Sequence, residues 1–99
     1  MVGDLRFEWD PAKARLNLRR HGVAFEEAKT AFADDHALIT DDPEHSADEM
    51  RLVLLGMSAG LRILVVVHVY QTAPDTIRII SARRATKTER HTYAKRLQP

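Results

Sequence analysis

The sequence predicts a single α+β domain over residues 1–99, with its elements in the order β-α-α-β-β-β-β-α. Near the N-terminus, apolar residues recur at helical spacing between recognisable start and stop signals. Further along, β-branched apolar runs follow one another across turns that are too short for crossover helices. Successive strands are therefore expected to pair in a mainly antiparallel sheet, with the helices mostly on one face.

The first strand and the first two helices are predicted from local signals. Residues 5–9, LRFEW, alternate apolar and polar side chains, which indicates a short strand. Asp10 followed by Pro11 is typical of an N-cap and first helical position, and Gly22 is the expected end of that helix. Residues 23–35 predict a second helix. Its apolar face consists of Phe25, Ala28 and Phe32.

The remaining strands are predicted from apolar, β-branched runs. These runs cover residues 36–40, 50–58, 61–70 and 75–83. The third run is the most continuously apolar, over residues 62–70, so it is expected at the centre of the sheet. Thr86 then predicts the N-cap of a last helix, and Glu89, three residues later, completes a capping box.

Composition limits the kinds of site that the chain can hold. The absence of cysteine excludes a disulfide framework, a thiolate zinc site and a cysteine nucleophile. No glycine-rich phosphate loop is present, and the histidines and carboxylates match no metal-ligand spacing, so we expect no metal and no cofactor. The sequence shows no signal peptide and no apolar run long enough to span a membrane, so a soluble cytoplasmic protein is expected.

The charges are unevenly distributed along the chain. Residues 77–97 contain seven Lys or Arg and one acid, Glu89, whereas residues 26–49 contain nine Asp or Glu and one Lys. A basic end on a protein of net charge +1 indicates a site for a polyanion. The alternative is a solvated charged face without a ligand.

Two arginines stand where the last strand meets the last helix. Arg83 and Arg84 lie beside a helix N-terminus, whose free N–H groups and partial positive charge favour phosphate. They form either a phosphate site or an exposed, solubilising loop. Strand alternation predicts that Arg83 shares a face with Ile79 and Ser81. It predicts the opposite face for Arg78 and Arg84.

Candidates for acid and base chemistry come from a strand and a loop. His68 interrupts an apolar strand and is either a candidate acid or base or a structural histidine with a hydrogen-bond partner. A loop that leads into a strand contains His45, Glu49 and Arg51, and loops on a rigid sheet often carry functional residues. Arg90 shares a helix face with residues expected to be buried, so it either pairs with an acid such as Glu49 or points into a groove.

Four separated segments share a pattern across nearly the whole chain. They read FEWDPAKARLNLRRHGVAFEEAKTAF, DPEHSADEMRLVLLG, LVVVH and IRIISARRATKTERHTY, and they extend over residues 7–93. In this order they resemble the BrnT toxin family, the ribonuclease halves of a class of bacterial type II toxin-antitoxin systems. The resemblance implies a RelE-like fold, RNA cleavage in the bacterial cytoplasm, and neutralisation by a BrnA-like antitoxin. That antitoxin would carry the DNA-binding domain, so operator DNA would be bound only through it.

The resemblance also implies roles for individual residues in metal-independent RNA cleavage. Arg83 and Arg78 would stabilise the phosphate. His68 or Glu49 would act as the base that activates the 2′-hydroxyl. Arg51, or a charged His68, would assist the leaving 5′-oxygen. The residues expected to bind RNA are Arg83, Arg84, Lys87 and Arg90.

Two other classes of function are compatible with the same residues. A nucleic-acid-binding module would use the arginines to hold a backbone without cutting it. A protein-docking module would use the basic surface to bind an acidic partner.

The first helix is expected to lie away from the catalytic centre. Lys13, Asn17 and Arg20 follow one another at helical spacing on one stripe, remote in sequence from the arginine cluster. We expect this stripe to face the antitoxin or to support the fold.

Overall fold

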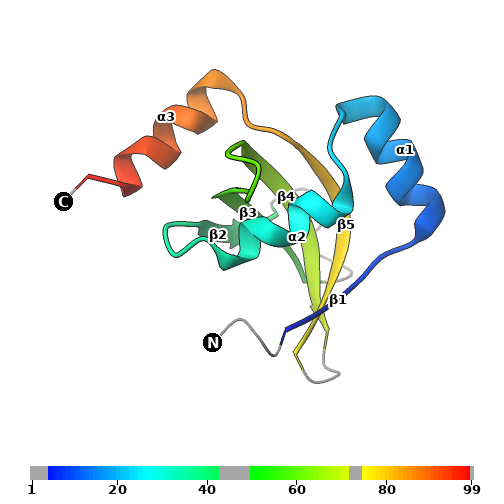
Figure 1. The fold of residues 1–99 in the computed structure, drawn as a ribbon. Helices are drawn as coiled ribbons and strands as arrows, with labels where there is room; N and C mark the ends of the chain where they lie inside the picture. Colours follow the sequence, from blue (N-terminus) through cyan, green and yellow to red (C-terminus); the bar gives the residue numbers. More distant parts are fainter. Residues whose placement is uncertain (1–4, 43–49, 72–74, 99) are drawn as a thin grey trace.

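The computed structural model describes residues 5–42, 50–71 and 75–98, in which five strands and three α-helices form one α+β unit (Figure 1). The elements are, in chain order, β1 (Arg6–Glu8), α1 (Pro11–His21), α2 (Phe25–Thr30), a 3-10 turn η2 (Ala31–Ala33), β2 (Leu38–Asp41), β3 (Arg51–Met57), β4 (Ile63–Gln71), β5 (Thr76–Arg84) and α3 (Lys87–Arg96). The α+β class is confirmed, and the strands and helices follow the predicted order. No helix among the described residues has the length and apolar character that a membrane span requires.

All five described strands belong to one sheet, in the order β1-β5-β4-β3-β2. Strands β2 to β5 pair antiparallel with their chain neighbours, and β4 lies at the centre, both as predicted. Strand β1 pairs parallel with β5, with Phe7 opposite Ile77. The sequence did not predict this pairing, because α1 and α2 separate β1 from the other strands and no turn signal identifies its neighbour.

The helix boundaries follow from local capping interactions. The Asp10 carboxylate accepts a hydrogen bond from the Ala12 N–H at 2.9 Å, which satisfies one of the free donors at the start of α1. Gly22 ends α1 in the left-handed conformation, with φ at 68°, that favours glycine. At α3, the Thr86 hydroxyl and the Glu89 carboxylate form the predicted capping box.

The second helix is shorter than the predicted span of residues 23–35. Helix α2 ends at Thr30, and the chain continues as η2 up to Ala33. The Thr30 hydroxyl donates to the Glu27 carbonyl at 2.6 Å and accepts from the Ala59 N–H at 2.8 Å. A side-chain bond to the preceding turn favours a bend, so the regular helix ends here.

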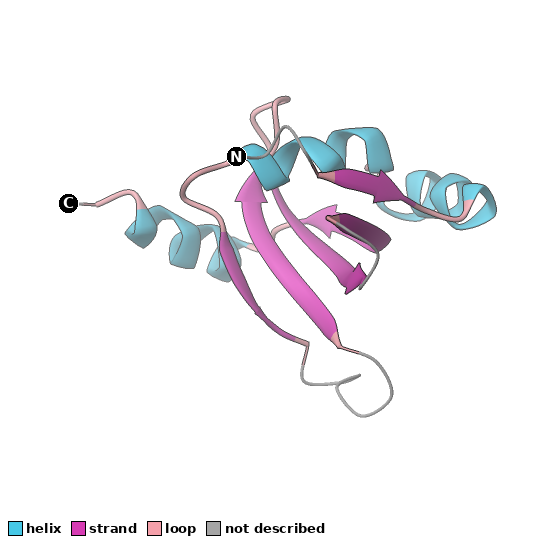
Figure 2. Ribbon diagram, turned by 90° about the horizontal axis from the view of Figure 1, so that it is seen from below, coloured by secondary structure: helices cyan, strands magenta, loops and turns pink. Residues whose placement is uncertain are grey.

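The main core lies between the sheet and the helices α1 and α2. Figure 2 shows α2 along one side of the sheet and α1 next to it at the far right, whereas α3, the helix nearest the C-terminus, lies apart from both. We call this side of the sheet the core face. The fully buried side chains of the core, from the sheet and from the segments packed on it, are Val23, Phe25, Ala28, Ala31, Leu54, Leu64, Val66, Ile79 and Ala82. Burial of each large apolar side chain contributes about 1.5–3 kcal/mol.

A smaller apolar cluster covers the other side of the sheet, which we call the open face. Leu55 and Val65 point there, because successive residues of a strand point to opposite faces, and they pack with Ala85 and Tyr93. The Tyr93 hydroxyl donates to Asp34 Oδ2 at 2.6 Å. Burial and Asp34 together raise the pKa of Tyr93 to about 12, which keeps the hydroxyl a donor. Helix α3 is therefore anchored on the open face and α2 on the core face, whereas α1 lies beside β5, to which Asn17 bonds it.

One residue of β5, Ile80, interrupts the pairing with β4. Val67 pairs with Ser81 and His68 pairs with Ile79, so the register passes over Ile80. Such a bulge inserts one residue into a strand and changes which of its side chains share a face. Ile79 consequently lies on the core face, whereas Ser81 lies on the open face. The predicted placement of these two residues on one face is wrong, because simple alternation cannot include the bulge.

The bulge also changes the distribution of the β5 arginines. Arg78 and Arg83 pair with Val69 and Val65, which lie on the open face of β4, and directly paired residues share a face. Arg78 and Arg83 therefore lie on the same side of the sheet, although simple alternation separates them. Arg84 pairs with a core-face residue, so it points away from Arg83 as predicted.

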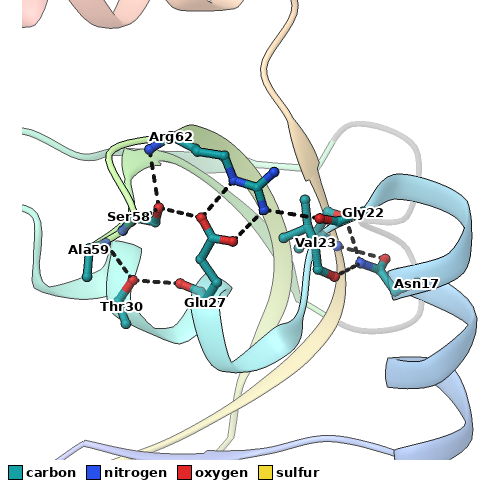
Figure 3. A network of polar contacts seen from close by, with 10 residues as sticks. Asn17, Gly22, Val23, Glu27, Thr30, Ser58, Ala59 and Arg62 are labelled. Atoms are coloured by element: carbon teal, nitrogen blue, oxygen red, sulfur yellow. Dashed lines mark hydrogen bonds and ion pairs between the residues drawn. The ribbon is translucent and has the colours of Figure 1, made fainter.

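Polar contacts fix α1 and α2 to the sheet (Figure 3). The buried Asn17 carboxamide donates to the carbonyls of Val23 at 2.9 Å and Ala82 at 2.8 Å, and it accepts from the Ala82 N–H at 3.1 Å. Strand β1 pairs only with the first residues of β5, Thr76 to Arg78. At Ala82, further along β5, the Asn17 carboxamide therefore takes the place of a strand partner. On α2, the Glu27 carboxylate accepts from Nε of Arg62, in the turn between β3 and β4, at 2.9 Å.

The substitution Asn17→Ala is expected to destabilise the fold by about 1–3 kcal/mol, since it leaves buried backbone groups of Ala82 without partners. Urea unfolding measures this difference. The matched control is Arg15→Ala on the exposed side of α1, for which we expect a change within about 0.5 kcal/mol. An Asn17→Ala protein as stable as the control would contradict this role of Asn17.

Candidate functional site

The open face carries three rows of paired residues across β3, β4 and β5. The rows are Arg51-Val69-Arg78, Val53-Val67-Ser81 and Leu55-Val65-Arg83. Neighbouring strands lie about 4.8 Å apart, so the Cα atoms of Arg51 and Arg78 are separated by about 10 Å across Val69. The face therefore has an apolar floor of valines, with arginines on the strands at both sides.

Two adjoining hollows over these rows form the candidate site, which we call the arginine groove. The first, of about 330 Å³, is lined by Asp42, Arg51, Val53, Val65, Val67, Ile80, Ser81, Arg83 and Glu89. The second, of about 220 Å³, is lined by Lys13, Arg51, Val69, Gln71, Arg78 and Ile80. Because Arg51 and Ile80 border both hollows, the groove extends from the start of α3 to α1.

Arg83 is held on the wall of the groove by Glu89. Its Nη1 and Nη2 atoms donate to the two Glu89 carboxylate oxygens at 2.8 Å each, and Nη1 also donates to the Arg84 carbonyl at 3.3 Å. One Glu89 oxygen accepts in addition from the Thr86 N–H at 2.8 Å. The hydrogen bonds from Arg83 are the main reason why the pKa of Glu89 falls to about 2.

The ion pair leaves one edge of the Arg83 guanidinium available. A guanidinium carries five N–H donors in a planar arrangement. In the part of the chain that the structure describes, Arg83 Nε makes no hydrogen bond. A phosphate can bind the edge formed by Nε and Nη2 while Glu89 keeps its own two bonds. The role of Arg83 as a phosphate ligand stays a prediction that this geometry allows.

His68 lies away from the arginine groove. It is 2% exposed on the core face, and its ring centre is 4.8 Å from that of Phe32 in an edge-to-face contact. Its Nδ1 atom is 3.1 Å from the Val66 carbonyl oxygen. Burial lowers the pKa of His68, which favours the neutral ring. These surroundings match the alternative of a structural histidine.

The other predicted residues divide into three groups. Arg51 and Arg78 line the groove. Three residues are exposed and do not line the groove, namely Arg84, Lys87 and Arg90. His45 and Glu49 lie outside the described residues, so their roles stay predictions. Within the described ranges, no group of three or more His, Asp or Glu side chains is placed to hold a metal ion.

The structure adds Lys13 and Asp42 to the lining of the groove. Lys13 borders the second hollow beside Arg51 and Arg78, so the expectation that α1 lies away from the arginines is wrong at this position. Helical spacing defined the stripe to which Lys13 belongs. The bonds of Asn17 to β5 determine where that stripe lies, and such bonds leave no pattern in the sequence.

A larger hollow, of about 790 Å³, lies elsewhere on the molecule. It lies between β1, η2, the end of β3 and α3, and its apolar lining includes Phe7, Phe32, Met57 and Leu97. Among the described residues, its charged lining includes Lys29 and Asp34 but no arginine. A phosphodiester needs positive charge at its binding site, so the arginine groove is the better candidate for a nucleic-acid site despite its smaller volume.

Comparison with known proteins identifies a family and a similar structure. Residues 9–89 match the family described as "Ribonuclease toxin, BrnT, of type II toxin-antitoxin system". The fold is similar to the crystal structure of the Brucella abortus ribonuclease toxin, BrnT, with a TM-score of 0.64 and 25% sequence identity. That match covers 84% of this chain and 99% of the Brucella chain. Comparison with curated proteins gives no significant match.

The pair of Arg83 and Glu89 predicts a pH-dependent contribution to stability. The folded state lowers the pKa of Glu89 from its usual 4.5 to about 2. The contribution is therefore fully present above pH 4.5 and is lost as the pH falls towards 2. At neutral pH we expect Glu89→Gln to lower the free energy of unfolding by about 1 kcal/mol, because both side chains are partly exposed. The difference from the parent should shrink as the pH falls, as measured by urea unfolding at a series of pH values.

The control for this series is Glu26→Gln, which removes the same charge from an exposed position on α2. We expect it to change stability by less than about 0.5 kcal/mol. A Glu89→Gln protein whose deficit persists unchanged at low pH would show that the carboxylate charge does not supply the stabilisation.

Proposed function

Because the chain belongs to the BrnT family of ribonuclease toxins of type II toxin-antitoxin systems, we propose that it cleaves RNA in the arginine groove without a metal ion. The observation that carries this proposal is the row in which Arg51 and Arg78 flank Val69 on the open face. Their guanidinium groups supply positive charge on both sides of an apolar floor. A phosphodiester lying over Val69 would be within reach of both.

Arg78 and Arg83 would stabilise the negative charge that builds on the phosphate during cleavage. The Arg78 side chain makes no hydrogen bond or ion pair with the described residues, so its N–H donors can bind a ligand. Arg83 would present the remaining edge of a guanidinium that Glu89 already orients. Donors that are fixed before the reaction stabilise a transition state most effectively, because they need not reorganise.

A carboxylate is the proposed base. It would remove the proton of the 2′-hydroxyl, so that this oxygen attacks phosphorus and the 5′-oxygen leaves. Glu49 remains the candidate from the sequence, and Asp42 is a second one, because it lines the groove beside Arg51. Glu89 is less suitable, because a carboxylate with a pKa of about 2 is a weak base. We do not assign the base to His68, whose ring is buried on the core face.

Arg51 would assist the departure of the 5′-oxygen. An arginine does not release its proton at neutral pH, so Arg51 would act through its charge and water would supply the proton. Lys87 and Arg90, exposed on α3 beyond the Glu89 end of the groove, would add contacts to the RNA backbone. Arg84 is less suited to this role because it belongs to the other face of β5.

The family also supports a setting for this activity. A ribonuclease toxin of a type II system has an antitoxin partner and an RNA target. We propose a BrnA-like antitoxin that binds operator DNA on behalf of the complex, and a bacterial cytoplasm as the location. A RelE-like classification of the fold belongs to the same proposal.

Purified protein is expected to cut labelled RNA at the same rate in excess chelator as in its absence, because the groove supplies its charge from arginines. Gel separation of the products measures this rate. Loss of cleavage in chelator, with recovery on addition of Mg²⁺, would contradict the metal-independent mechanism. RNA binding without product ends under every condition would instead support a nucleic-acid-binding module that does not cut.

The substitution Arg78→Ala is expected to slow cleavage by about a hundred- to a thousandfold, the typical effect of removing one well-placed electrostatic stabiliser. Arg84→Ala removes the same charge from the same strand but from the opposite face, so it should change the rate only slightly. The two variants are compared by their single-turnover cleavage rates, and circular dichroism verifies that both are folded. If Arg84→Ala proved the more damaging change, the open face would not be the reacting surface.

A further inference from the structure

A third hollow connects the arginine groove to the surface of α1. It has a volume of about 260 Å³ and is bordered on the α1 side by Lys13 and Arg20. It shares Ile80 and Ser81 with the first hollow of the groove, and Lys13 with the second. The three hollows therefore adjoin at the bulge of β5.

Positive charge continues along this connection. Lys13 and Arg20 extend the three groove arginines onto α1. Among the described residues, two carboxylates, Asp42 and Glu89, line the three hollows, against five cations, which are Lys13, Arg20, Arg51, Arg78 and Arg83. A continuous cationic channel that starts at the proposed cleavage site is complementary to a nucleic-acid backbone.

We propose that single-stranded RNA leaves the arginine groove over α1, where Lys13 and Arg20 bind phosphates beyond the one that is cleaved. The proposal rests on the proposed function, because it takes the groove as the place of cleavage. Seven residues of α-helix span about 10 Å, so the two side chains would contact different phosphates.

The position of α1 makes this surface a fixed part of the molecule. Asn17 lies between Lys13 and Arg20 in the sequence and on the same side of the helix, and its carboxamide bonds directly to the backbone of Ala82 in β5. The Asp10 cap and Gly22 fix the two ends of α1. Lys13 and Arg20 are exposed on either side of this anchor, along the edge of the sheet that leads to the groove.

The test is the salt dependence of RNA binding by Lys13→Ala and Arg20→Ala. The probe is a single-stranded, fully 2′-O-methylated oligoribonucleotide of mixed sequence, which cannot undergo attack by a 2′-hydroxyl. Each phosphate contact with a single strand contributes about 0.7 to the slope of log K against log salt, so each variant should lower the slope by about that amount. Alanine favours the helix, and circular dichroism verifies folding.

Arg15→Ala is the matched control, because it removes one positive charge from α1 at a position about 200° around the helix from Lys13. It lines none of the three hollows, and its slope should equal that of the parent protein. Equal effects of Arg15→Ala and Lys13→Ala would overturn the proposal in favour of diffuse attraction. An unchanged slope for Lys13→Ala, with weakened binding of the antitoxin, would overturn it in favour of a protein interface.

The slopes are measured without cleavage, so they distinguish this proposal from the proposed function. A parent protein that binds the probe with the expected loss of slope in both variants, but cuts no RNA, would support the path over α1 and contradict the nuclease activity. Cleavage by the parent protein, with unchanged slopes in both variants, would support the nuclease activity and contradict the path over α1.

Discussion

The arrangement of the candidate site depends on the extra residue that β5 carries at Ile80. The pairing with β4 passes over this residue, which moves Ser81 and Arg83 onto the same face as Arg78. A regular strand would place Arg78 and Arg83 on opposite faces, because side chains alternate along a strand. The same shift keeps Ile79 and Ala82 in the core between the sheet and its two helices. One irregularity thus supplies both a continuous core and a continuous cationic face.

Two polar side chains connect this face to the helices at its ends. Asn17 bonds α1 to the β5 backbone, which brings Lys13 beside the groove. The Glu89 carboxylate both caps α3 and pairs with Arg83. The same side chain therefore fixes the start of the helix and the orientation of the guanidinium. Loss of either contact would therefore change the groove as well as the fold.

Local chemistry explains what the sequence predicted correctly. The Asp10 cap, Gly22 and the capping box of Thr86 and Glu89 involve residues close together in the chain, and their patterns have few alternatives. The BrnT resemblance, carried by separated segments, was also confirmed. The parallel pairing of β1 with β5, the bulge and the burial of His68 against Phe32 depend on residues distant in sequence. A sequence pattern does not record such contacts, and for that reason the groove could be predicted by residue type but not by arrangement.

We propose that RNA binds the open face of the sheet in the arginine groove. Backbone amide chemical shifts of the isotope-labelled protein, measured during addition of a non-cleavable RNA, locate the binding surface. We expect the amide chemical shifts of Val53, Val67 and Ser81 to change with RNA concentration, and those of α2 to stay unchanged. Shifts concentrated on α2, or around the apolar hollow between η2 and α3, with none at Val67 and Ser81, would contradict it.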